Sequence, residues 1–159
     1  MCLKIDDKLT KKLKGRSRSF NAYKVYTCMN LSNHTLWLKS WHDNLPGGTV
    51  TKHGYIESDY KRIIAPFSYI TQRNGEKLVH SGIHTFLNKK DAKTYIIEGN
   101  FISFPVIVKV RVNPKNVLGV GPICYNGSTA IFMGCVSISS TKVFISEKEF
   151  NRAIKQGEQ

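Results

Sequence analysis

Hydrophobic and polar residues alternate most regularly between Pro105 and Val112. Successive side chains of a β-strand point to opposite faces of its sheet, so this pattern predicts a strand with one buried face and one open face. The buried face is expected to carry the valines at positions 106, 108, 110 and 112. The open face is expected to carry Ile107, Lys109 and Arg111.

Other strands are predicted where β-branched and aromatic residues gather between turn signals. The first covers residues 22–27, and turns are expected at Pro46-Gly47-Gly48 and at Asn113-Pro114. The remaining expected strands cover residues 49–51, 63–70, 77–80, 117–120, 130–138 and 142–145.

Two short helices are predicted, over residues 88–97 and 147–156. Asn88 can accept hydrogen bonds from the free N–H groups at the start of the first helix. Ser146 and Glu149 have the spacing of a capping box at the start of the second. Together these patterns predict an α+β fold, a mostly antiparallel sheet with two short helices.

Basic residues dominate the start of the chain. Six of them lie within eleven positions, interspersed with glycine and serine, and they are Lys8, Lys11, Lys12, Lys14, Arg16 and Arg18. Such a segment is typical of a solvated terminus. We therefore expect residues 1–21 to form a flexible basic arm that is dispensable for folding. Residues 22–159 are expected to form a single α+β domain.

The overall charge narrows the class of partner. The 159 residues include 24 Lys and Arg against 11 Asp and Glu, a net charge of +13. This excess favours an anionic partner, either a nucleotide or a nucleic acid. No apolar run approaches the ~18 residues of a membrane-spanning helix, and the start of the chain lacks the apolar segment of a signal peptide. We therefore expect a cytoplasmic protein with no membrane partner.

Several short segments occur in an order that is found elsewhere. They are Tyr23-Lys24-Val25-Tyr26, Ser81-Gly82-Ile83-His84-Thr85-Phe86-Leu87, Asp91-Ala92-Lys93-Thr94-Tyr95 and Val108-Lys109-Val110-Arg111-Val112. Over roughly residues 22–145 this order resembles small, mostly uncharacterised bacteriophage and bacterial domains, some of which are attached to pentapeptide-repeat chains. The resemblance implies a phage-encoded protein acting in the host cytoplasm, in a role such as counter-defence.

The same order more distantly resembles the ADP-ribosyltransferase-like fold. Tyr23, His84 and Tyr95 fit that pattern, which implies an enzyme that uses NAD. A catalytic glutamate near the last strands is common in that group. This chain departs from the pattern, because it has no acidic residue between Glu98 and Glu147.

Seven residues form the candidate site for an anionic nucleotide. Lys24, Lys109 and Arg111 would supply positive charge from strands. His84 and Lys89 would meet phosphate near the start of the first helix, where the helix dipole favours anions. Tyr23 or Trp37 would stack on a base. His84 has an alternative interpretation, a structural histidine satisfied by backbone groups.

Three functions remain open from the sequence. The first is non-catalytic sequestration of an anionic nucleotide, such as a cyclic nucleotide or an NAD-derived immune signal. The second is DNA or RNA binding through the basic arm, and the third is an ADP-ribosyltransferase-like activity. No catalytic residue is assigned, and no cofactor or metal is expected, because the histidine spacings match no compact metal motif. An acid-free sheet face would also allow a homo-oligomer.

Overall fold

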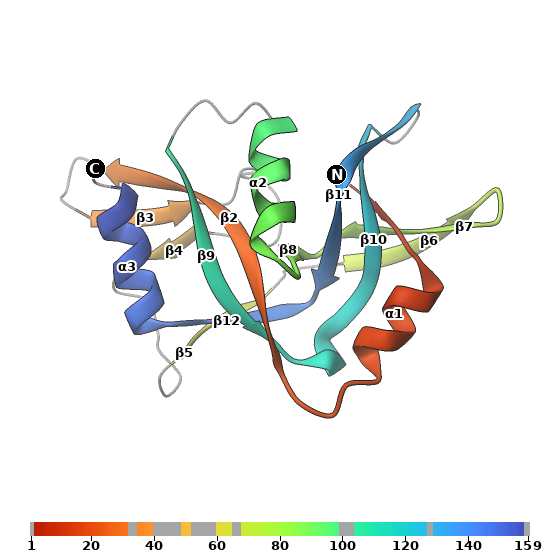
Figure 1. Ribbon diagram of the computed structural model, residues 1–159, viewed down its shortest axis with the longest axis horizontal. Helices are drawn as coiled ribbons and strands as arrows, with labels where there is room; N and C mark the ends of the chain where they lie inside the picture. Colours follow the sequence, from red (N-terminus) through yellow and green to blue (C-terminus); the bar gives the residue numbers. More distant parts are fainter. Residues whose placement is uncertain are drawn as a thin grey trace.

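The computed structural model describes residues 2–31, 35–39, 49–51, 60–64, 68–98, 104–126 and 129–157. These residues form one large sheet and three α-helices (Figure 1). The helices are α1 (Asp7–Lys14), α2 (Lys89–Glu98) and α3 (Glu147–Gly157), and a 3-10 turn covers Pro114–Asn116. The strands are β1 (Cys2–Lys4), β2 (Phe20–Leu31), β3 (Thr35–Lys39), β4 (Thr49–Thr51), β5 (Tyr60–Ile64), β6 (Ser68–Arg73), β7 (Glu76–Ser81), β8 (Ile83–Phe86), β9 (Pro105–Val112), β10 (Val117–Asn126), β11 (Thr129–Ser140) and β12 (Lys142–Ser146).

The predicted fold class is confirmed. The strands run in the order β5-β12-β9-β2-β8-β11-β10-β1-β7-β6, with β3 and β4 attached to β2, and every pairing between described strands is antiparallel. Helices α2 and α3 match the two predicted helices. The single strand expected at residues 63–70 is wrong, because β5 and β6 lie at opposite ends of the sheet.

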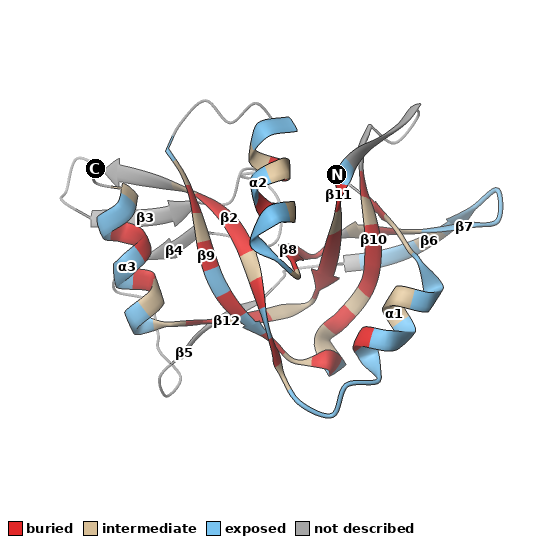
Figure 2. Ribbon diagram, viewed as in Figure 1, coloured by how far each residue is buried: buried red, intermediate tan, exposed pale blue. Residues whose placement is uncertain are grey.

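Strands β2 and β9 pair over the whole length of β9, from Phe20 opposite Val112 to Thr27 opposite Pro105. The four valines of β9 are buried, whereas Lys109 and Arg111 are exposed, as the alternating pattern predicts (Figure 2). Directly opposite residues of an antiparallel pair share a face. The register therefore gives β2 the same two faces, one toward the larger part of the core and one open.

Two hydrophobic clusters form the core. The larger one joins the valine face of β9 to β2, β10, β11 and β12, and it includes Leu13 of α1 and Phe150 of α3. The smaller one lies under α2 and contains Val25, Phe86, Ala92, Tyr95, Ile123 and Cys135. In Figure 1, α2 lies between the β9–β2 side and the β11–β10 side of the sheet.

The predicted flexible arm at residues 1–21 is wrong. Strand β1 pairs with both β10 and β7, and Leu3 at its centre is fully buried. Asp6 caps α1 by accepting a hydrogen bond from the Leu9 N–H at 2.9 Å, and Leu13 is only 2% exposed. Strand β2 also begins at buried Phe20, before the expected boundary. The basic segment is thus a packed part of the domain.

Two glycines of β10 allow this N-terminal segment to lie close to the sheet. A Cβ atom at Gly121 would lie 1.8 Å from the Lys4 carbonyl oxygen, a distance that no side chain can occupy. A Cβ atom at Gly119 would lie 2.9 Å from side-chain atoms of Ile5 and Val79. The close approach lets the Asp6 N–H donate to the Val120 carbonyl at 2.8 Å.

Helix α3 covers the edge of β9 that β12 leaves open. The Lys109 N–H donates to Glu149 Oε1 at 2.8 Å, and Arg152 Nη2 donates to the Ile107 carbonyl at 2.8 Å. Glu149 and Arg152 also form an ion pair. The predicted cap of α3 is present, since Ser146 Oγ accepts from the Glu149 N–H. The carboxylate of Glu149 accepts the hydrogen bond from the Lys109 N–H of β9. These contacts hold the backbone of Lys109 in place.

Leu13→Ala tests whether α1 belongs to the core. Removing this buried side chain should lower the free energy of unfolding by about 2–5 kcal/mol, because a cavity would remain in the larger cluster. Lys12→Ala, on the exposed side of the same helix, is the control and should change stability by less than about 0.5 kcal/mol. Urea unfolding measures both. Equal, negligible effects would show that the helix is not packed.

Candidate functional site

The open face of β2 and β9 brings together four of the seven predicted site residues. Tyr23 lies directly opposite Lys109, and Asn21 lies directly opposite Arg111. Lys109 and Arg111 are exposed, and Tyr23 is half-buried. Lys89 reaches the same place from the start of α2, with its Nζ 5.8 Å from the centre of the Tyr23 ring.

The start of α2 is fixed by the predicted cap. Asn88 Oδ1 accepts from the Asp91 N–H at 2.8 Å, and Asn88 Nδ2 donates to Asp91 Oδ2 at 3.0 Å. Ala92 and Tyr95 bury the other side of the helix against the sheet. This packing leaves Lys89 and Lys90 exposed at the helix start.

Lys24 does not belong to this surface, so its predicted role is wrong. It lies opposite Val108 on β9 and therefore faces the larger cluster. Its side chain is 4% exposed, and Nζ donates to the His84 carbonyl at 3.2 Å. Nζ also lies 5.3 Å from the centre of the Tyr26 ring. Burial lowers the pKa of Lys24 to about 8.

His84 is also enclosed, and its predicted role at the surface is wrong. The residue is 9% exposed in β8, a strand whose four residues are all buried. His84 Nδ1 lies 3.2 Å from Ser137 Oγ, within hydrogen-bond distance. The burial agrees with the alternative of a structural histidine, but this partner is a side-chain hydroxyl and not a backbone group. Tyr95 is 8% exposed, so two of the three residues behind the ADP-ribosyltransferase resemblance are buried.

Trp37 lies on β3, where its backbone pairs with Met29 and Thr51. Its side chain lies outside the residues whose side chains the structure describes. Stacking by Trp37 therefore stays a prediction.

The segment predicted as an arm carries two further exposed cations. Arg16 and Arg18, with Ser17 and Ser19 between and after them, line a shallow hollow of about 440 Å³ between α1 and β2. The guanidinium carbon of Arg16 lies 5.0 Å from the centre of the Phe20 ring. Phe20 lies opposite Val112 and belongs to the larger cluster.

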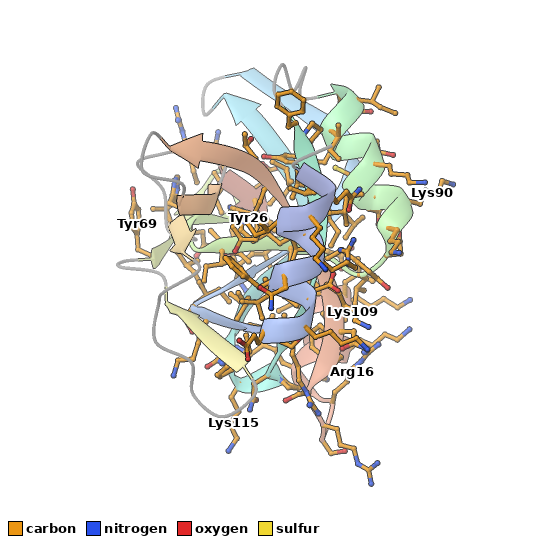
Figure 3. All side chains as sticks on the ribbon, turned by 90° about the vertical axis from the view of Figure 1, so that its left-hand side faces the viewer. Arg16, Tyr26, Tyr69, Lys90, Lys109 and Lys115 are labelled. Carbon is orange, nitrogen blue, oxygen red and sulfur yellow. The ribbon has the colours of Figure 1, made fainter. Side chains whose placement is uncertain are left out.

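We call this set of residues the basic surface. Its cations come from the α1–β2 loop, from β9 and from the start of α2, and they are Arg16, Arg18, Lys89, Lys90, Lys109 and Arg111. Figure 3 shows Arg16, Lys109 and Lys90 on the same side of the molecule, with Tyr69 on the opposite side. The sequence predicted that Arg16 and Arg18 lie on a flexible arm that could bind nucleic acid, and it missed that this segment is packed against the domain.

Asp91 and Glu149 are acidic residues, within the described part of the chain, that touch the basic surface. Asp91 is engaged at the cap of α2. Burial raises the pKa of Glu149, but hydrogen bonds from Arg152 and the Lys109 backbone outweigh this effect, so the net pKa lies below its ordinary value. Arg152 balances the charge of this carboxylate. The basic surface therefore keeps an excess of positive charge.

No protein family model, curated protein or solved structure matches this chain. The two resemblances drawn from the sequence therefore stay predictions. Within the described residues, no cluster of His, Cys, Asp and Glu is suited to hold a metal ion. None of the helices described above has the length and apolar character needed to cross a membrane.

The buried lysine makes a prediction about pH. The pKa of Lys24 is about 8 when folded and 10.5 as a free side chain, so between these values the unfolded chain binds more protons. Stability should therefore rise with pH in this window, by about 3 kcal/mol relative to Lys24→Met. Urea unfolding in gluconate salts from pH 7 to pH 10.5 measures the difference. Lys109→Met, at an exposed lysine, is the control, and its stability should change with pH as that of the wild type does. If the difference in stability between the wild type and Lys24→Met does not change with pH, the amine is not buried.

Proposed function

We propose that the protein binds single-stranded nucleic acid through the basic surface. The observation that carries this proposal is the grouping of Lys89, Lys109 and Arg111 beside Tyr23. Arg16 and Lys90 lie on the same side of the molecule as Lys109 (Figure 3). Phosphate groups supply most of the affinity of such surfaces, and a basic face is their usual footprint. The net charge of +13 agrees with this class of partner.

The shape of the surface favours a polymer. Lys109 and Arg111 are two residues apart on β9, which corresponds to about 6.6 Å along a strand. Arg16 and Arg18 add exposed positive charge before the start of β2, and Lys89 and Lys90 add exposed positive charge at the start of α2. A strand following these cations would meet successive phosphates.

Tyr23 supports a single strand over a duplex. Its ring is half-buried against the smaller cluster, so its position is held by packing. Bases that are not paired can stack on such a ring, whereas a duplex offers no free base face. Lys89, which lies over the ring, would then move to a phosphate.

A second candidate function is sequestration of a small anionic nucleotide. The compact group formed by Tyr23, Lys89, Lys109 and Arg111 favours it, because one base and its phosphates would span these residues. The two functions differ in counterion release. A polymer displaces many ions from the surface, while a small ligand displaces few.

Salt dependence of binding tests the proposal. The double variant Lys109→Ala, Arg111→Ala should bind a short fluorescent single strand about 3–6 kcal/mol more weakly, because it loses two charge-assisted hydrogen bonds worth about 1.5–3 kcal/mol each. The slope of log K against log salt should also fall in magnitude by about 1.4, or 0.7 for each lost phosphate contact. Fluorescence anisotropy across a salt series gives both numbers.

Arg73→Ala, Lys115→Ala is the matched control. It also removes one arginine and one lysine from exposed positions, but these lie outside the basic surface. The control should keep the wild-type affinity and slope. Equal losses in both double variants would point to overall charge and contradict the site. Tight binding of a mononucleotide or cyclic dinucleotide with almost no salt slope would favour sequestration.

A further inference from the structure

A group of polar side chains lies inside the larger hydrophobic cluster. Lys24 is 4% exposed, and Tyr26, Thr85 and Ser140 are fully buried. We call these four residues the Lys24 cluster. They come from β2, β8 and β11, which are neighbours in the sheet. Figure 3 shows Tyr26 within the body of the molecule near α3.

The register places these side chains on one face. Lys24 and Tyr26 lie opposite Val108 and Val106 of the larger cluster. Thr85 lies opposite Ile138, and Ser140 lies opposite Ile83; both isoleucines belong to that cluster. Lys24 Nζ donates to the carbonyl of His84, whose next residue is Thr85. The amine and the hydroxyls therefore face the same interior.

The hydroxyl groups of this cluster are unsatisfied. In the described part of the chain, no hydrogen-bond partner meets Tyr26 Oη, Thr85 Oγ1 or Ser140 Oγ. A buried hydroxyl without a partner lowers the stability of the folded state, so three in one core are unusual. Each hydroxyl can donate a hydrogen bond to an acceptor placed between them.

The charge of the cluster is equally unbalanced. Among the described residues no carboxylate forms an ion pair with Lys24, whose Nζ has one hydrogen-bond acceptor and the face of the Tyr26 ring as neighbours. An ammonium group has three donors. Buried charges are normally paired, because leaving the charge alone in an apolar interior is costly. With a pKa of about 8, the amine is mainly protonated at neutral pH.

We propose that the Lys24 cluster binds a small monovalent inorganic anion, such as chloride, inside the core. One ammonium group and several hydroxyl donors are the chemistry that such an anion needs, and the anion would supply both the missing acceptor and the missing negative charge. A neutral water molecule would satisfy the hydroxyls but would leave the charge of Lys24 unbalanced. The site is separate from the basic surface, since it faces the opposite side of β2.

Thermal unfolding of the full chain at pH 7 tests the site. Melting temperatures are compared in sodium chloride, sodium bromide and sodium gluconate at equal ionic strength. A ligand that binds only the folded state raises stability in proportion to the logarithm of its concentration above Kd. Chloride and bromide should raise the melting temperature above its value in gluconate, and Lys24→Met should remove the difference. Lys115→Met, at an exposed lysine, should keep it.

Two outcomes would overturn the proposal. The first is equal melting temperatures in halide and gluconate, and the second is a halide effect of the same size in Lys24→Met as in the wild type. If Lys24→Met does not fold, anomalous diffraction from a bromide-grown crystal of the wild type decides. A bromide peak beside Lys24 Nζ would support the site, and a water molecule there, or no peak, would refute it.

Discussion

The register between β2 and β9 is the constraint on which the rest of the structure depends. It sends the valines of β9 into the core and leaves Lys109 and Arg111 on the surface. A slip of one residue would exchange the two faces, and would bury two charges in place of valines. Glu149 and Arg152 on α3 bond the exposed edge of β9 and so hold this strand from its other side. The core and the candidate site are therefore two consequences of one pairing.

The alternation of β9 and the caps at Asn88 and Ser146 were enough to predict the fold class, β9 and two helices. The N-terminal helix was missed because its lysines dominate the pattern. Its signals were Asp6 as a cap and the four-residue spacing of Leu9 and Leu13. The sequence of the N-terminal segment does not show the surface of the sheet against which the segment packs. That surface depends on glycines of β10 more than one hundred positions away.

The candidate site was predictable only in part. Tyr23 and Lys24 are neighbours in a strand, so alternation alone separates them, and only one can face the same side as Lys109. Charge favoured Lys24 for that surface, but its pairing with Val108 places it in the core. His84 gave no such signal, because β8 lies in the middle of the sheet and is buried on both faces. The burial of Lys24 and of His84 depends on tertiary packing, which the local sequence pattern does not encode.

Chemical-shift mapping with a short single-stranded oligonucleotide tests the central claim most directly, since it shows which backbone amides sense the ligand. We expect the largest changes on the α1–β2 loop, on the paired segments Asn21–Tyr23 and Lys109–Arg111, and at the start of α2. Amides of the β6–β7 hairpin should remain unchanged. Changes centred on that hairpin, or none at saturating oligonucleotide, would contradict the account.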